Sequence, residues 1–175
     1  MTDSTLNPES IAREPGLKPA AELQIRPFQP GEAAAFRSLN EEWIARFFTI
    51  EDRDRETLGD PEGHIIRPGG HIFMAQLGDE VVGCCALIPF APGVFELSKM
   101  AVAPALRGRG IGRRILSYVI DQANALGADS LFLASSTRLT NAVHLYESLA
   151  FRHLGPDEIP PVPYKRASVF MSLKM

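Results

Sequence analysis

The stretch ELSKMAVAPALRGRGIGRRIL, residues 96–116, joins an apolar run to a loop with three alternate glycines and four arginines. Gly108, Gly110 and Gly112 carry no side chain, so a ligand can approach backbone N–H groups that a side chain would shield. The residues before the loop predict a strand and those after it predict a helix, so the free N–H groups and the helix dipole point to one place. With arginines beside it, such a place suits an anion, and a pyrophosphate in particular.

The spacing of the glycines separates the known phosphate-binding patterns. The Walker loop requires G-x-x-x-x-G-K-[ST], and no Lys-Ser or Lys-Thr pair follows these glycines. The dinucleotide fingerprint requires G-x-G-x-x-G and an acidic residue at the end of the next strand. Here the spacing is G-x-G-x-G, and the only acid of the next predicted strand, Asp129, lies at its beginning. The sequence therefore excludes a Walker loop and disfavours a nicotinamide cofactor.

Length and composition limit the class of protein. A chain of 175 residues is long enough for one ordinary domain, which we expect to span residues 22–175. Residues 1–21 lack apolar periodicity and predict a disordered tail. The chain is 45% hydrophobic and 22% charged, and it carries neither a membrane-span pattern nor a signal-peptide pattern, so we expect a cytoplasmic protein with no membrane partner. A net charge of −3 also gives no reason to expect a nucleic-acid partner.

Cysteine and histidine give no indication of a metal site. Cys84 and Cys85 are neighbours in an apolar run, and we interpret them as small buried hydrophobic residues rather than as a redox pair. The four histidines show no zinc-ligand spacing; they are His64, His71, His144 and His153. We therefore predict no metal.

Apolar periodicity predicts a mixed α+β domain with the order β-α-α-β-β-β-α-β-α-β-β. The predicted strands are 22–28, 71–77, 80–90, 94–102, 131–134, 151–154 and 167–175. The predicted helices are 31–48, 52–58, 111–126 and 141–150. The Gly- and Pro-rich segments 58–70 and 155–165 are predicted as loops.

Two segments resemble one known family. Arg107, Gly110 and Gly112 match R-x-x-G-x-G, and LSKMAVAPALRGRGIGRRIL resembles the acyl-CoA-binding segment of the GNAT superfamily of N-acyltransferases. NAVHLYESLAFRHLG resembles the next segment of that superfamily, a helix with an L-Y-x-x-x-G-F-like signature. The resemblance covers residues 22–175 and implies the GNAT fold, a central mixed and largely antiparallel sheet flanked by helices. One departure is Ala150, where the family has glycine, so a left-handed helix cap there would cost about 1 kcal/mol.

The resemblance implies acetyl-CoA as co-substrate and assigns residues to it. Backbone N–H groups from Gly108 to Gly112 would bind the pyrophosphate, arginines of the loop would add charge, and the backbone of the preceding strand would pair with the pantetheine arm and the acyl oxygen. The implied coenzyme-binding residues are Met100, Ala101, Val102, Arg107, Gly108, Arg109, Gly110, Ile111, Gly112, Arg113 and Asn141. The alternative is a plain strand-to-helix turn with solvated arginines.

Two residues are implied in catalysis. Acyl transfer to an amine requires removal of the ammonium proton, and Glu96 is the candidate base. The alternative is an edge-strand acid or a salt-bridged surface acid, for which Lys99 is a candidate partner. Tyr146 is the candidate proton donor to the departing thiolate, the alternative being a core tyrosine on the apolar stripe of its helix. Asn141 is a candidate cap of that helix as well as a pantetheine contact.

The acceptor is predicted only by class. Trp43, Phe47, Phe48 and Tyr164 are candidates for an apolar wall, with Glu51 or Asp52 attracting a cationic amine. The alternative is that these aromatic residues form the core face of an amphipathic helix.

The leading hypothesis is a single-domain N-acetyltransferase that acts in a ternary complex on a small amine or an amino acid. The alternatives are a protein lysine or N-terminal acetyltransferase, a non-catalytic acyl-CoA-binding module and a nucleotide-binding regulator. The resemblance also leaves a homodimer open.

Overall fold

The computed structural model describes residues 21–175, whose strands form one seven-stranded sheet in the order β1-β2-β3-β4-β5-β7-β6. The strands are β1 (Leu23–Pro27), β2 (His71–Leu77), β3 (Glu80–Ala91), β4 (Val94–Val102), β5 (Ser130–Ser135), β6 (Arg152–His153) and β7 (Val169–Lys174). Of the observed pairings, only that of β4 with β5 is parallel. The predicted α+β class and the order of elements are confirmed. The predicted tail, residues 1–21, lies outside the described residues except for Ala21.

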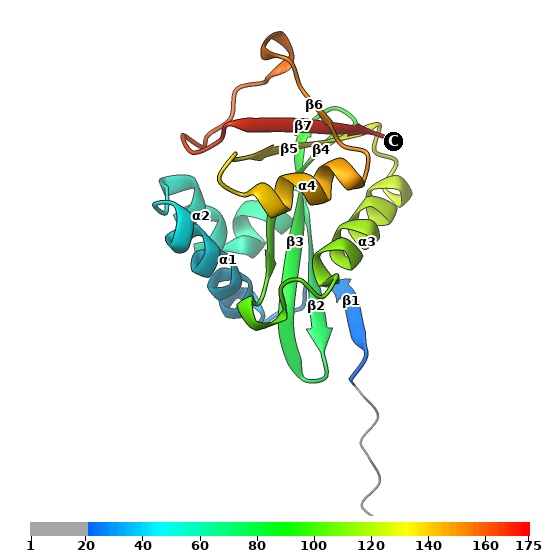
Figure 1. The fold of residues 1–175 in the computed structure, drawn as a ribbon. Helices are drawn as coiled ribbons and strands as arrows, with labels where there is room; N and C mark the ends of the chain where they lie inside the picture. Colours follow the sequence, from blue (N-terminus) through cyan, green and yellow to red (C-terminus); the bar gives the residue numbers. More distant parts are fainter. Residues whose placement is uncertain (1–20) are drawn as a thin grey trace, which may run out of the picture.

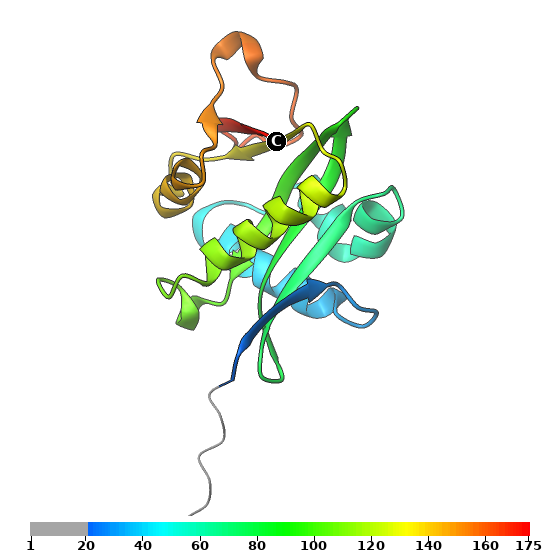
Figure 2. The same cartoon turned by 90° about the vertical axis from the view of Figure 1, so that its right-hand side faces the viewer.

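Helices cover both faces of the sheet. They are α1 (Ala33–Phe47), α2 (Asp52–Gly59), α3 (Ile111–Ala125) and α4 (Thr140–Ser148). One buried core lies between the sheet and α3 with α4, and a second lies between the sheet and α1 with α2 (Figure 1, Figure 2). The apolar stripe of α3 explains its position, because Ile115, Leu116 and Val119 are completely buried.

Two predicted irregular segments contain short helices. Within the predicted loop 58–70, a π-helix spans Glu62–Ile66, and the Arg67 N–H donates to the Glu62 carbonyl at 2.8 Å. This turn forms because it buries Ile65 completely in the core that also contains Phe36 and Ile44 of α1. The prediction of a loop was therefore wrong at these residues. In the second segment, a 3₁₀ turn spans Pro156–Glu158. The sequence did not predict either turn, because glycine and proline indicate where regular helices and strands end but not which side chains between them are buried.

The sheet opens between β4 and β5. The two strands pair only from Val94 with Ser130 to Glu96 with Phe132, so the rest of β4 has no strand partner on that side among the described residues. Toward β3 the register also shifts, because Ser98 faces Ala86 while three residues further along Ala101 faces Cys84. This β-bulge places Lys99 in the left-handed region, at φ 53°. The opening and the bulge together form the floor of the site described below.

The end of α4 has the cap geometry that the sequence left in doubt. Ala150 has φ 68°, although it carries a β-carbon. The Phe151 N–H donates to the Tyr146 carbonyl at 3.1 Å, and the Ala150 N–H donates to the Glu147 carbonyl at 3.0 Å. This is the pair of hydrogen bonds of a Schellman cap, so alanine takes the position that normally favours glycine.

Candidate active site

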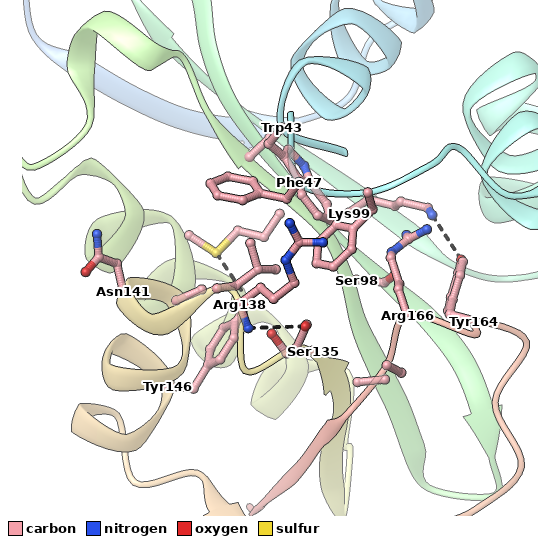
Figure 3. Close-up of a pocket in the computed structure, with 18 of the residues that line it drawn as sticks. Trp43, Phe47, Ser98, Lys99, Ser135, Arg138, Asn141, Tyr146, Tyr164 and Arg166 are labelled. Atoms are coloured by element: carbon pink, nitrogen blue, oxygen red, sulfur yellow. Dashed lines mark hydrogen bonds between the residues drawn. The ribbon is translucent and has the colours of Figure 1, made fainter. Parts of the chain in front are cut away.

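A pocket of about 580 Å³ lies at the opening between β4 and β5. Figure 3 shows Trp43 and Phe47 on one side of it, Tyr146 and Asn141 on another, and the Arg138 side chain reaching between them. The β4 residues Met100, Ala101 and Val102, which the sequence predicted to contact a pantetheine arm, also line this pocket.

The three glycines of the loop are required for two different reasons, backbone conformation and close packing. Gly108 and Gly110 have φ of 76° and 78°, which only glycine adopts without strain, and a β-carbon at either would meet open space. Gly112 instead allows close packing, because a β-carbon there would lie 3.0 Å from the Met100 Cε. Arg114 is the first residue whose N–H bonds within this turn, to the Gly110 carbonyl at 3.1 Å. Among the described residues, the N–H groups from 108 to 113 donate no hydrogen bond, so they remain available to an anion.

The arginines of the loop have separate partners. Arg107 turns back: its Nε donates to the Val102 carbonyl at 3.0 Å, and its guanidinium pairs with Glu42. Its charge is therefore already neutralised, so Arg107 fixes the loop to the end of β4 rather than offering a free charge to phosphates. Arg113 donates to Ser148 at 2.6 Å. Arg109 is exposed, and in the described structure its side chain makes no hydrogen bond or ion pair.

Glu96 is half-buried and lines the pocket. Burial raises its pKa above the usual value for glutamate, while the charge of Lys99 and a hydrogen bond with Ser98 act against this. The alternative of an ion pair with Lys99 is wrong, because the Lys99 ammonium binds Asp54 instead. The carboxylate of Glu96 thus has the half-buried position and raised pKa of a general base.

Tyr146 and Asn141 extend into the pocket from α4. The Tyr146 side chain is buried, with its hydroxyl 4.0 Å from the Met100 sulfur, and burial raises the pKa of the phenol. The group therefore stays protonated at neutral pH. Asn141 lies in the first turn of α4 and makes no capping hydrogen bond, so its predicted role as a cap is wrong.

The predicted aromatic wall comes together at the pocket. Trp43, Phe47, Phe48 and Tyr164 all line it, while the core face of α1 consists of Phe36, Asn40 and Ile44. The two carboxylates predicted to attract an amine are not available there. Glu51 accepts from the Lys165 and Arg166 N–H groups at 3.0 and 3.3 Å, and Asp52 lies in solvent beside Arg55.

A buried charge cluster behind this wall was missed by the sequence prediction. The Asp54 carboxylate receives the Lys99 ammonium at 2.8 Å and the Arg166 guanidinium at 2.5 and 2.9 Å. Burial alone would raise the pKa of Asp54, but the hydrogen bonds from Arg166 and the charge of Lys99 outweigh it and lower the pKa to about 2. Lys99 also donates to the Tyr164 hydroxyl at 2.9 Å, which fixes that ring at the pocket. No local pattern signals this cluster, since its members are distant in sequence.

Residues 33–151 match the model of the acetyltransferase (GNAT) family. A curated N-acetyltransferase of Schizosaccharomyces pombe is 31% identical over 153 residues, which are 83% of this chain and 90% of that protein. The chain therefore belongs to the GNAT family of acetyltransferases. Membership of this family supports an acyltransferase activity.

Two further comparisons describe what the chain is similar to. An amino-acid acetyltransferase of Neisseria meningitidis is 31% identical over 156 residues, 86% of this chain, but the chain spans only 31% of that protein. The solved structure of a Salmonella typhimurium acetyltransferase with acetyl-CoA has a TM-score of 0.70 at 21% identity, covering 88% of this chain and 94% of that one, which shows the shared fold. None of the helices in the described part of the chain is long and apolar enough to cross a membrane.

Proposed function

We propose that this protein transfers an acetyl group from acetyl-CoA to the primary amine of a small molecule or an amino acid, with both substrates bound at once. One observation carries the proposal: a single pocket at the opening between β4 and β5 is lined by Tyr146 and Asn141 from α4 and by Trp43 and Phe47 from α1. Two substrates that enter from different sides can therefore meet there. The amino-acid acetyltransferase relative supports an amine acceptor.

The residues of this chain fit the coenzyme. The free N–H groups from 108 to 113 suit its pyrophosphate, and Arg109 offers an unpaired charge beside them. The unpaired edge of β4 at Met100 and Ala101 offers backbone groups to an extended pantetheine arm. When bound, acetyl-CoA supplies the activated thioester that an amine attacks.

Glu96 and Tyr146 divide the proton transfers between them. Glu96 accepts the proton that the acceptor ammonium must lose before its nitrogen can act as a nucleophile. Tyr146 holds its proton at neutral pH and donates it to the sulfur that leaves. Backbone N–H groups on the open edge of β4 polarise the thioester carbonyl.

Calorimetric titration with acetyl-CoA, ATP and NAD tests the proposal, followed by a thiol-release assay with amines. We expect acetyl-CoA alone to bind, and Arg109→Glu to weaken binding about tenfold, because a charge-assisted contact becomes a repulsion. Arg67→Glu, a change of the same kind at an exposed residue directly after the π-helix Glu62–Ile66, should have no effect. Gly110→Val should abolish binding by straining the loop. A folded native protein that binds no acetyl-CoA, or that binds it and acetylates no amine, would refute the proposal.

A further inference from the structure

A second hollow of about 700 Å³ adjoins the main pocket on the acceptor side. The two share five side chains, which are Arg46, Phe47, Phe48, Arg138 and Arg166. The second hollow extends outward past the end of α1 to Thr49, Glu51 and Lys165. It therefore forms the outer part of the space available to an acceptor.

The charge of this hollow is opposite to that of the whole chain. The net charge of the protein is −3, yet the hollow is lined by four cationic side chains and by a single carboxylate, that of Glu51. Arg166 pairs with Asp54 and, at 3.6 Å, with Glu51, which also accepts from the backbone N–H groups of Lys165 and Arg166. The charges left over are those of Arg46, Arg138 and Lys165. A local excess of positive charge attracts an anion.

Arg138 is the central member of this group. Its guanidinium makes no hydrogen bond or ion pair within the described residues, and it lies 5.2 Å from the centroid of the Phe48 ring. In Figure 3 it reaches into the main pocket toward Trp43 and Phe47. Arg46 lies in the same way over Phe47, at 5.4 Å. An arginine stacked on a ring keeps its N–H edge free, and that edge matches the two oxygens of a carboxylate or phosphate.

The charged side chains that line the main pocket determine how a charged acceptor is oriented in it. Lys99 and Arg166 are both bound to Asp54, and Arg107 is paired with Glu42. Among the described residues that line the pocket, this leaves Glu96 as the negative group and Arg138 with Arg46 as the unpaired positive groups. An amine is attracted to Glu96. A group of opposite charge on the same molecule is attracted to Arg138.

We propose that the acceptor carries, besides its reacting amine, an anionic group of carboxylate or phosphate type that Arg138 binds with the support of Arg46. The apolar part of the acceptor lies against Trp43 and Phe47. This inference rests on the proposed acetyltransferase function and adds the chemical class of its acceptor.

A panel of matched acceptors tests the inference by thiol release. The panel contains α-amino acids and ω-amino acids of two to six carbons, each beside its carboxamide and its aminophosphonate. We expect kcat/KM at least tenfold higher for an anionic acceptor than for its carboxamide. Arg138→Gln should bring this ratio close to one, mainly through KM, because a hydrogen-bonded ion pair contributes about 10- to 100-fold.

Two further variants sharpen the test. Arg138→Lys, which keeps the charge but loses the planar fork, should retain part of the ratio. Arg37→Gln, which removes a charge from the outer surface of α1, should leave the ratio unchanged. A preference for the carboxylates over the phosphonates identifies the anion as a carboxylate, and the reverse order identifies it as a phosphate.

The failures of the two proposals are distinguishable. Equal turnover of the acids and their carboxamides, or a ratio that Arg138→Gln leaves unchanged, would overturn the anionic acceptor while leaving the acetyltransferase intact. If acetyl-CoA binds but no amine of any charge is acetylated, the acetyltransferase function itself is overturned, and the acceptor class with it.

Discussion

The Lys99 ammonium lies 2.8 Å from the Asp54 carboxylate, and the two side chains are 2% and 0% exposed. Lys99 comes from the bulge of β4, Asp54 from α2, and Arg166, on the same carboxylate, from the segment before β7. One buried carboxylate thus joins three parts of the chain around the acceptor side of the pocket. Removing its charge leaves the buried Lys99 ammonium without an anionic partner and leaves Arg166 with Glu51 alone, at 3.6 Å.

Asp54→Asn is therefore expected to destabilise the protein by about 3 kcal/mol, since breaking a buried ion pair leaves an uncompensated charge. The measurement is the free energy of unfolding in urea. Asp52→Asn, two residues away with a side chain that is 98% exposed, is the matched control and should change stability by less than about 0.5 kcal/mol. An Asp54→Asn protein within about 1 kcal/mol of the native one would contradict this account.

The Asp54 carboxylate also makes the free energy of unfolding depend on pH. Its pKa falls from an ordinary value of 3.8 in the unfolded chain to about 2 in the folded protein. The unfolded state therefore binds the proton more readily, so the contribution of Asp54 is complete above about pH 4 and is lost as pH falls toward 2. We expect a loss of about 2 kcal/mol across this range. In urea titrations at several pH values, Asp54→Asn should lack this part of the acid dependence.

Glu96→Gln should lower kcat about 100-fold and leave the Kd for acetyl-CoA unchanged, because the base acts on the acceptor and not on the coenzyme. Burial raises the pKa of Glu96, so the acid limb of the native pH–rate profile should lie above the range of an ordinary glutamate and should disappear in the variant. Glu80→Gln, an exposed acid at the start of β3, is the control. An unchanged kcat in Glu96→Gln would remove this residue from the mechanism.

Tyr146→Phe should also lower kcat, by about 100-fold, because the departing thiolate loses its proton donor. Folding should change little, since the only hydrogen-bond partner of the hydroxyl in the described structure is the Met100 sulfur at 4.0 Å. Tyr118→Phe serves as the control, because Tyr118, on α3, packs against Phe73 of β2 with ring centroids 5.5 Å apart. Steady-state kinetics with saturating acetyl-CoA would show both effects. Full activity in Tyr146→Phe would mean that this tyrosine is a core residue alone.

Ala150→Gly should stabilise the protein by about 0.5 to 1 kcal/mol. The left-handed conformation of Ala150 carries a β-carbon penalty that glycine avoids, and the gain is reduced by the greater freedom of glycine in the unfolded chain. Thermal unfolding would show a higher Tm. The opposite change is expected for Ala125→Gly at the end of α3, where the backbone is helical. A lower Tm for Ala150→Gly would contradict the strain at this cap.

Local patterns predicted the strands, the four longer helices and part of the site, but not the π-helix at Glu62–Ile66. Periods of two and of three to four residues predicted the strands and helices, since alternation and helical spacing are set by backbone geometry within a few residues. The spacing of the loop glycines predicted a bare turn at the start of a helix, and Gly108 and Gly110 have the positive φ that such a turn requires. The resemblance of its segment to the family, rather than the apolar stripe of α4, assigned Tyr146 to the site, and Tyr146 lines the pocket.

Contacts between distant segments were decided only by the tertiary structure. The sequence assigned Arg107 to phosphates and Glu51 to an amine, but Glu42 lies 65 positions before Arg107, and the backbone that Glu51 binds lies 114 positions after it. Asp54 likewise meets Lys99 and Arg166 across 45 and 112 positions. Pairing over such separations depends on strand register, on the β4 bulge and on the course of the last connection, none of which leaves a local periodic signal. The sequence therefore determined the elements and the glycine turn, whereas the fold alone decided which charges are neutralised and which, like Arg138, face the pocket.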